Sequence, residues 1–213
     1  MKALLVCEYR EGKLLDASYE LIAFADRLGA DKVLVVIGGE GALPRFNGQV
    51  YLADAGKYGE YNPDLHKKLV LAAVDKENPD CIVFVHSSYG WDLAPRVAAA
   101  LKAAQVSEVV AVADGNYEVT CCNGKMRRTI TPATARTVVT IQAGAFTASP
   151  AEGTPQVTML DLADTVSPVE FLGYEAADAK GVDLAKAEVI VSAGRGVGKK
   201  ENVPLIAALA KAL

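Results

Sequence analysis

The chain has 213 residues, of which 51% are hydrophobic and 23% are charged, and its formal net charge is −4 at pH 7. This length and composition predict a folded protein with a sizeable buried core, and they exclude an intrinsically disordered chain. A nucleic-acid partner is not expected, because the chain is acidic and its basic pairs are scattered at Lys67-Lys68, Arg127-Arg128 and Lys199-Lys200.

Apolar runs in the sequence are short. Residues 3–7 and 81–85 are among the longest, at about five residues each. A membrane-spanning helix needs about 20 apolar residues, and the core of a signal peptide needs about 7–15. We therefore expect no membrane insertion and a cytoplasmic location.

The four cysteines form neither a metal-binding nor a disulfide pattern. They lack C-x-x-C spacing and lie in apolar, strand-like stretches, where thiols behave as small buried hydrophobic groups. A bond between the two adjacent cysteines is not favoured, because neighbouring side chains on a strand point to opposite faces. We expect buried thiols in a reducing compartment at Cys7, Cys81, Cys121 and Cys122.

The first half of the sequence alternates apolar runs with amphipathic segments, which is the pattern of βαβ units. Strands buried in a parallel sheet are continuous apolar runs, whereas helices place apolar residues at three- and four-residue intervals. Asp16 or Ser18 can cap the first helix, and Pro95 falls in the first turn of the third, where a missing N–H costs little. Strands are predicted at residues 2–7, 32–37, 49–53 and 81–85, and helices at residues 18–28, 62–77 and 91–104.

The pattern changes in residues 108–141. Two hairpin dipeptides, Asp114-Gly115 and Asn123-Gly124, separate short runs with strand character. The predicted fold class is therefore α/β, with a mostly parallel, doubly wound sheet that carries an antiparallel hairpin excursion. The strands of this excursion are expected at residues 109–113, 117–122, 125–131 and 136–141.

The last part of the chain predicts an edge strand, a linker and a new β–turn–α unit. Residues 157–172 indicate an edge strand followed by irregular chain, and the polar segment 174–184 indicates the linker. Strand 187–192, a glycine-rich turn and helix 201–213 then have the pattern of the opening of a further domain. The helix has an apolar stripe that needs a partner surface, formed by Leu205, Ile206, Leu209 and Leu213.

The glycine-rich turn, Gly194-Arg195-Gly196-Val197-Gly198, is the candidate site with the clearest chemistry. Backbone N–H groups and a helix dipole at such a turn can receive an anion, and an arginine adds bidentate donors suited to a pyrophosphate. Lys199 stands where G-x-G-x-x-G needs glycine or alanine, and Ala193 and Lys200 break the P-loop pattern. On the residues alone, a structural turn and a phosphate contact both stay open.

Two other glycine-containing segments follow predicted strands at the sheet edge where α/β proteins bind ligands. Residues 90–96 open a helix in which Asp92 and Arg96 are within salt-bridge reach. Gly38 to Gly41 could let a phosphate approach the backbone. We favour a locally stabilised helix start for the first segment and a plain loop for the second.

The histidines do not predict a catalytic or metal site. His86-Ser87-Ser88 places a base beside a hydroxyl, but neighbouring side chains diverge at a strand end and no G-x-S-x-G elbow is present. We interpret Ser87 or Ser88 as a helix cap. His66 is expected on a helix surface, and two histidines so far apart do not support a transition-metal site.

Five segments together indicate a known family. Their order and spacing hold over nearly all of the chain, and the G-x-D-L-A-P-R and S-x-G-R-G-x segments are together quite specific. The sequence resembles the alpha subunits of electron transfer flavoproteins, including relatives linked to nitrogen fixation. The matching segments are residues 3–8 with Gly12-Lys13-Leu14, residues 79–84, residues 90–96, Gly144-Ala145-Phe146, and residues 191–196 followed by Glu201-Asn202.

The resemblance implies a domain organisation. Residues 1–185 would form an N-terminal α/β domain with an adenine-nucleotide hydrolase-like sheet that packs against a beta subunit. Residues 186–213 would form the first β–α unit of an incomplete, flavodoxin-like FAD-binding domain. FAD would be bound in the complete protein and absent from this 213-residue chain. A second hypothesis concerns where the beta subunit binds. It places the interface on the sheet's other face and on the hairpin region, residues 109–141.

The resemblance also implies a function. An electron transfer flavoprotein relays electrons through FAD between dehydrogenases, which are the donors, and an acceptor, so the chain would be a carrier and not an enzyme. The arginine that contacts FAD in the family falls on Arg195, between Gly194 and Gly196. The chain departs from the family at Trp91, where an arginine is common, and at Gln142-Ala143, which replace Arg-Pro.

Two alternatives come from other classes of protein. One is a free-standing adenine-nucleotide-binding α/β module that uses the Gly38 to Gly41 loop and the helix opening at Gly90. The other is a scaffold that docks a partner and has no redox function.

Overall fold

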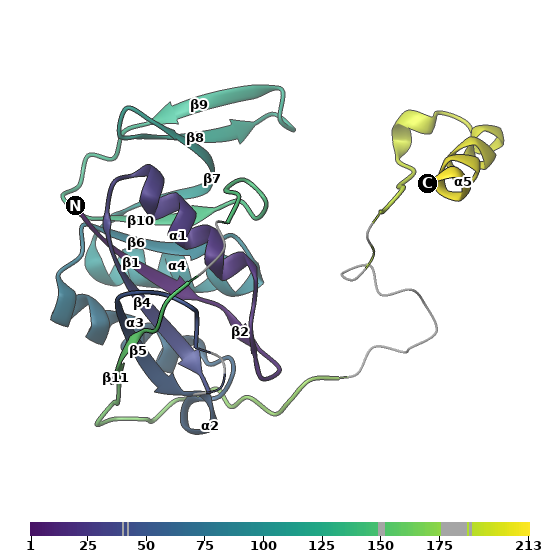
Figure 1. Ribbon diagram of the computed structural model, residues 1–213. Coiled ribbons are helices and arrows are strands. Elements are labelled where there is room, and N and C mark those ends of the chain that lie inside the picture. Colours follow the sequence, from purple (N-terminus) through teal and green to yellow (C-terminus); the bar gives the residue numbers. More distant parts are fainter. Residues whose placement is uncertain (40, 42, 149–151, 176–186, 188) are drawn as a thin grey trace. The chain divides into compact units, whose positions relative to one another are not determined.

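The computed structural model describes residues 1–39, 41, 43–148, 152–175, 187 and 189–213. By its internal contacts the chain divides into two units, Met1–Phe171 and Leu172–Leu213 (Figure 1). Each unit is described by itself. None of the helices in the described part of the chain is long and apolar enough to cross a membrane.

The Met1–Phe171 unit is built on one large sheet with the strand order β11-β5-β4-β1-β6-β10-β7-β8-β9 (Figure 1). Neighbours from β11 to β7 run parallel, whereas β7, β8 and β9 are antiparallel. A small antiparallel pair, β2 and β3, lies outside it. The strands are β1 Lys2–Cys7, β2 Tyr9–Arg10, β3 Lys13–Leu14, β4 Asp31–Gly38, β5 Gln49–Asp54, β6 Cys81–Val85, β7 Ala104–Ala113, β8 Asn116–Cys121, β9 Met126–Ile130, β10 Thr137–Ile141 and β11 Gln156–Met159.

Helices cover both faces of the parallel part of the sheet, because the alternating side chains of its strands are apolar on both sides. On one face, Leu21 and Phe24 of α1 pack into a core with Leu5 and Val83. On the other, α3 and α4 pack over Leu4 and the side chains that share its face. The predicted α/β class with a mostly parallel, doubly wound sheet is therefore confirmed. The helices of this unit are α1 Ala17–Arg27, α2 Ala55–Tyr58, α3 Pro63–Glu77 and α4 Ser88–Leu101.

One strand expected in the antiparallel excursion belongs to the parallel sheet. β10 lies parallel between β6 and β7, and all five of its residues are buried. A strand buried on both faces suits the interior of a parallel sheet. The antiparallel part is therefore restricted to β7, β8 and β9, which turn at the two predicted hairpin dipeptides.

The helix predicted at residues 91–104 is α4, and it differs from the prediction at both ends. α4 begins at Ser88, three residues earlier than expected, because the Ser87 hydroxyl accepts the Gly90 N–H and caps it, as predicted for a serine here. It ends at Leu101, since Lys102 adopts a left-handed conformation. Pro95 therefore lies inside the helix and not in its first turn. Pro95 and Trp91 are both exposed, so the Trp91 carbonyl that loses its donor can reach water.

The prediction that the cysteines are buried is confirmed for Cys7 and Cys81 and is wrong for Cys121 and Cys122. Cys7 and Cys81 are buried, and burial raises the pKa of each thiol to about 12. Cys121 is half-buried and Cys122 is exposed, because the latter enters the turn after β8 with φ of 53°. All four are free thiols.

In the described part of the Leu172–Leu213 unit, the predicted helix is present, whereas residues 187 and 189–192 of the predicted strand form no strand. α5 spans Val203–Ala212, after the 3₁₀ turns η3 Arg195–Val197 and η4 Lys200–Asn202. Residues 189–192 are irregular, because a strand needs a neighbouring backbone and no described residue pairs with them. Residue 188 and most of the predicted linker, residues 176–184, lie outside the described residues.

Candidate functional site

At the carboxyl edge of the sheet, the side chain of Tyr9 covers the end of β4. Tyr9 packs so tightly on the end of β4 that a Cβ at Gly38 would lie 2.7 Å from the Cδ2 atom of Tyr9. A Cβ at Gly39 would lie 3.5 Å from the Tyr9 hydroxyl oxygen. Tyr9 therefore covers the backbone of Gly38 and Gly39, the first two glycines of the candidate phosphate loop, whereas a Cβ at Gly41 would meet no atom within 4 Å.

Gly90 serves packing at the same edge. A Cβ at this position would lie 1.9 Å from the carbonyl oxygen of Val85, so only glycine lets α4 approach the end of β6. Ser87, beside it, donates a hydrogen bond of 2.5 Å to the Glu8 carboxylate. This edge presents a carboxylate where a nucleotide phosphate would need donors.

His86 is held by a hydrogen-bonded group that does not include a serine. Its Nδ1 lies 2.8 Å from the Oγ1 atom of Thr140, and its Nε2 lies 3.4 Å from an Oε1 atom of Glu108. The Thr140 hydroxyl also accepts the Glu108 N–H at 3.1 Å. Because Ser87 donates to Glu8 instead, the structure does not join His86 and Ser87 into a nucleophile–base pair.

His66 lies in the core and not on the helix surface, which corrects the prediction from the sequence. It is fully buried, with Nε2 3.0 Å from the Gly59 carbonyl oxygen and Nδ1 3.2 Å from the Tyr89 hydroxyl. Burial lowers the pKa of His66 to about 4, although the Gly59 carbonyl opposes this shift. α3 therefore carries a neutral imidazole inward, satisfied at both nitrogens.

Tyr61, for which no sequence pattern predicted a role, completes this cluster. The ring centroid of Tyr61 lies 5.9 Å from that of His66 and 5.6 Å from that of Tyr89. Its hydroxyl binds the Asp92 carboxylate, which also pairs with Arg96 at 3.0 Å. Burial alone would raise the pKa of Asp92, but the bonds from Tyr61 and Arg96 outweigh it and lower the pKa. The predicted Asp92–Arg96 contact is thus part of a structural network.

The three predicted site residues lie together on an open turn of the Leu172–Leu213 unit. Gly194 is extended and Arg195 begins η3, which is closed by the Val197 N–H to Gly194 carbonyl bond of 3.1 Å. A Cβ at Gly194 or Gly196 would meet no atom within 4 Å. The side chain of Arg195 is exposed and has no partner among the described residues.

The turn leads into α5 through a second 3₁₀ turn. Asn202 links the two, since its side-chain amide donates to the Val197 carbonyl at 3.0 Å. Residues 194–202 carry a net positive charge, because they include three cationic side chains, Arg195, Lys199 and Lys200, and one carboxylate, Glu201. A guanidinium and two ammonium groups before a helix N-terminus match the chemistry of a pyrophosphate. These residues therefore fit the phosphate part of a dinucleotide.

A metal centre has no support in the part of the chain that the structure describes. No group of three or more His, Cys, Asp or Glu side chains there could hold a metal ion. The two histidines make the hydrogen bonds described above, and the Cys7 and Cys81 thiols are buried in the core.

Comparison with known proteins gives the family. The protein-family model described as "Electron transfer flavoprotein domain" matches residues 3–165 of this chain. The electron transfer flavoprotein subunit alpha of Bacillus subtilis is 28% identical over all of this chain and 70% of the relative. That of Bradyrhizobium diazoefficiens is 32% identical over 95% of this chain and 66% of the relative, and that of Mycobacterium leprae is 30% identical over 100% and 70%. The chain spans about two thirds of the length of these relatives, and it belongs to the electron transfer flavoprotein family.

Proposed function

We propose that this chain acts as an electron transfer flavoprotein alpha subunit, which carries electrons from dehydrogenases to an acceptor. The observation that carries this function is similarity to alpha subunits along the whole chain, from β1 through the turn at Arg195. In this role the chain is a carrier and not a catalyst of a substrate reaction. A cytoplasmic location is part of the proposal.

FAD is the cofactor in this proposal, and residues 186–213 open the domain that binds it, after an N-terminal domain of residues 1–185. Bound FAD accepts and donates the electrons. The chain's own part is to hold and orient the group through nearby charge. Arg195 would contact FAD, with Gly194 and Gly196 leaving room for close approach, because the guanidinium has no partner among the described residues and a Cβ at either glycine would meet no atom within 4 Å.

The test uses flavin absorbance. We expect the purified 213-residue chain to be colourless. A chimera that continues through the carboxyl-terminal third of a homologous alpha subunit, co-expressed with a beta subunit, should be yellow. In the chimera, Arg195→Ala should weaken FAD binding about 10- to 100-fold, since a hydrogen bond to a charged group contributes about 1.5–3 kcal/mol.

Lys211→Ala is the matched control, because it removes a cation from the exposed far end of α5. Flavin absorbance that stays absent from the chimera complex would contradict the function. Equal FAD affinity in the Arg195 and Lys211 variants would contradict the assigned site alone.

The antiparallel hairpin is proposed as the contact for the beta subunit. β9 ends the sheet order, so one side of its backbone is unpaired within the described sheet. It exposes Met126 and Arg128, and an edge of this kind invites pairing with another chain. Met126→Asp should reduce co-purification with a beta subunit, whereas Met159→Asp, at an equally exposed methionine on the opposite edge strand β11, should not. Undiminished co-purification of the Met126 variant would contradict this contact.

The free-standing nucleotide module is not supported by the sheet edge. Tyr9 covers Gly38, and the Glu8 carboxylate lies beside Ser87 at the opening of α4. We therefore expect ATP and AMP to leave the melting temperature unchanged. A clear rise without a beta subunit would favour the module instead.

A further inference from the structure

The end of the Met1–Phe171 unit is a segment without helix or strand, which we call the strap and define as residues 160–171. It follows β11 and lies along α2 and α3. Its first residue belongs to the core, since the Leu160 N–H donates to the Leu52 carbonyl at 2.7 Å and the side chain is 2% exposed. After Leu160, the strap forms no backbone pairing with a strand. It is held instead by side chains of α2 and α3 and by Asn62, the residue before α3.

The first contact lies close to β11. The Asp161 carboxylate accepts from Lys57 and from the Tyr58 hydroxyl, and the Leu162 N–H donates to the same hydroxyl at 2.8 Å. Leu162 is also packed against the core. The strap is therefore tied to the body as far as Leu162.

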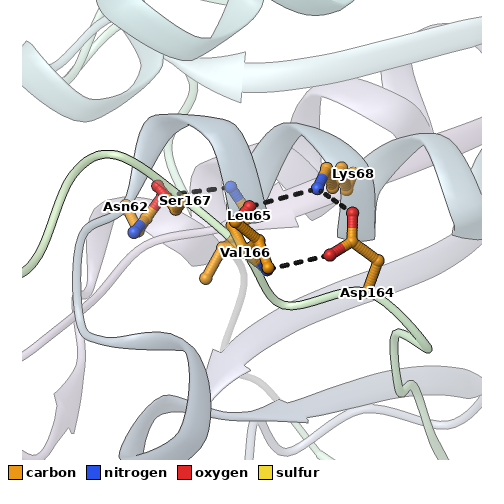
Figure 2. Close-up of polar contacts among 6 residues, drawn as sticks. All are labelled: Asn62, Leu65, Lys68, Asp164, Val166 and Ser167. Carbon is orange, nitrogen blue, oxygen red and sulfur yellow. Dashed lines mark hydrogen bonds and ion pairs between the residues drawn. The ribbon is translucent and has the colours of Figure 1, made fainter.

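The second contact is made by one lysine of α3 (Figure 2). The Nζ atom of Lys68 lies 2.9 Å from a carboxylate oxygen of Asp164 and 3.3 Å from the Val166 carbonyl oxygen. The other carboxylate oxygen of Asp164 accepts the Val166 N–H at 3.0 Å, which makes a local turn. The Asp164 side chain is 66% exposed, so this ion pair is of the weak, screened kind.

The third contact uses both polar atoms of the buried Asn62 side-chain amide, and Figure 2 shows the contacts of its oxygen. The Oδ1 atom of Asn62 accepts the Leu65 N–H at 3.1 Å, which caps α3, and it also accepts the Ser167 hydroxyl at 3.1 Å. Its Nδ2 atom donates to the Val169 carbonyl at 2.6 Å. Asn62 is 4% exposed. One side chain therefore both begins a helix and holds the end of the strap.

From these contacts we propose that residues 163–171 form a latch that opens as a local unit while the sheet stays folded, and that Asn62 and Lys68 set how often it opens. Few apolar groups in this stretch are buried, which is the property of segments that unfold locally. Nine extended residues span roughly 30 Å. Opening therefore moves the point at which the chain leaves the body, and it regulates how far the residues after Phe171 can reach.

Hydrogen exchange of the 213-residue chain, followed by mass spectrometry, tests the latch. Asn62→Asp keeps the oxygen that caps α3 but removes the amide donor and places a carboxylate against the Val169 carbonyl. It should speed exchange about tenfold at the Val166 and Val169 amides, which donate hydrogen bonds to Asp164 and Ser167, since a hydrogen bond contributes about 0.5–1.5 kcal/mol. Lys68→Met should speed it about two- to fivefold, as expected for an exposed ion pair.

Lys67→Met is the matched control, because Lys67 neighbours Lys68 on α3 and has no hydrogen bond or ion pair among the described residues. It should leave the exchange of residues 163–171 unchanged, and α3 and β5 should keep their wild-type protection in all three variants. Wild-type exchange of the latch as slow as that of α3 would overturn the proposal. So would unchanged exchange of the latch in both Asn62→Asp and Lys68→Met.

Discussion

The helices of the two units differ in what their apolar faces touch. In Met1–Phe171, Leu69 and Val70 of α3 are fully buried against the sheet. In Leu172–Leu213, Leu205 and Leu209 of α5 are 69% and 49% exposed, although the helix has an apolar stripe of the same kind. A periodic sequence pattern thus specifies a helix and its apolar face, whereas neighbouring elements decide whether that face is buried.

Truncation of one leucine in each unit gives the largest expected contrast. Leu69→Ala removes a fully buried side chain and should lower the free energy of unfolding by about 3 kcal/mol, through lost burial and the cavity left behind. Leu205→Ala should change it by less than about 0.5 kcal/mol, because this side chain is exposed. Urea unfolding of the 213-residue chain measures both. A loss of 2 kcal/mol or more at Leu205 would show that α5 packs in solution.

Glycines sharpen the same contrast. Gly90→Ala should cost about 2–3 kcal/mol, since the new Cβ would lie 1.9 Å from the Val85 carbonyl oxygen and α4 would have to move. Gly196→Ala, whose Cβ meets nothing within 4 Å, is the control and should leave the unfolding midpoint unchanged within error. Equal unfolding midpoints for the two variants would show that α4 does not approach β6 this closely.

Acid should destabilise the Met1–Phe171 unit through His66. Its pKa is lowered to about 4 in the folded chain and is about 6.5 when unfolded, so the unfolded state binds more protons between these values. The stabilisation is complete above pH 6.5 and is lost as the pH falls toward 4. Between pH 8 and pH 5 this group should lower the free energy of unfolding by about 2 kcal/mol.

His66→Gln keeps a neutral donor and acceptor for Gly59 and Tyr89, so it is the variant that isolates this effect. Its unfolding free energy, measured by urea titration at each pH, should fall less steeply with acid than that of the wild type. Parallel curves for the two proteins would mean that His66 is not buried as a neutral group.

The α/β class could be predicted from the sequence because strands buried in a parallel sheet are continuous apolar runs, whereas amphipathic helices have apolar residues at three- and four-residue intervals. Thr137–Ile141 was assigned to the wrong part of the sheet, because hairpin dipeptides before a strand report local turns and not which neighbour it joins. The predicted start of α4 lies three residues too late, because Pro95 favours a first-turn position whereas the Ser87 cap begins the helix at Ser88. The first error concerns contacts between residues far apart in the chain, which periodicity does not encode, whereas the second concerns a local hydrogen bond between Ser87 and Gly90.

Prediction of the candidate site had the same limit. Arg195 and its two glycines are consecutive, so local chemistry alone placed them on one turn. The His66 cluster joins residues from α3, α4 and the loop before α3, and no spacing rule indicated that Tyr61 would meet Asp92. A histidine on an otherwise apolar helix face was the one signal available.

The smallest expected effect on stability comes from an exposed ion pair within the Met1–Phe171 unit. It tests whether exposure of a side chain, and not the unit to which it belongs, decides how much its loss destabilises the chain. Arg96 pairs with Asp92 four residues earlier at 3.0 Å, and both side chains are about 40% exposed. Arg96→Met should therefore lower the unfolding free energy by only about 0.5 kcal/mol, and 1 M NaCl should remove the difference. Arg45→Met, at an exposed arginine without a partner among the described residues, is the control. A loss above 2 kcal/mol at Arg96 would mean that the Tyr61–Asp92 network behaves as a buried one, and exposure would then not be the property that separates the two units.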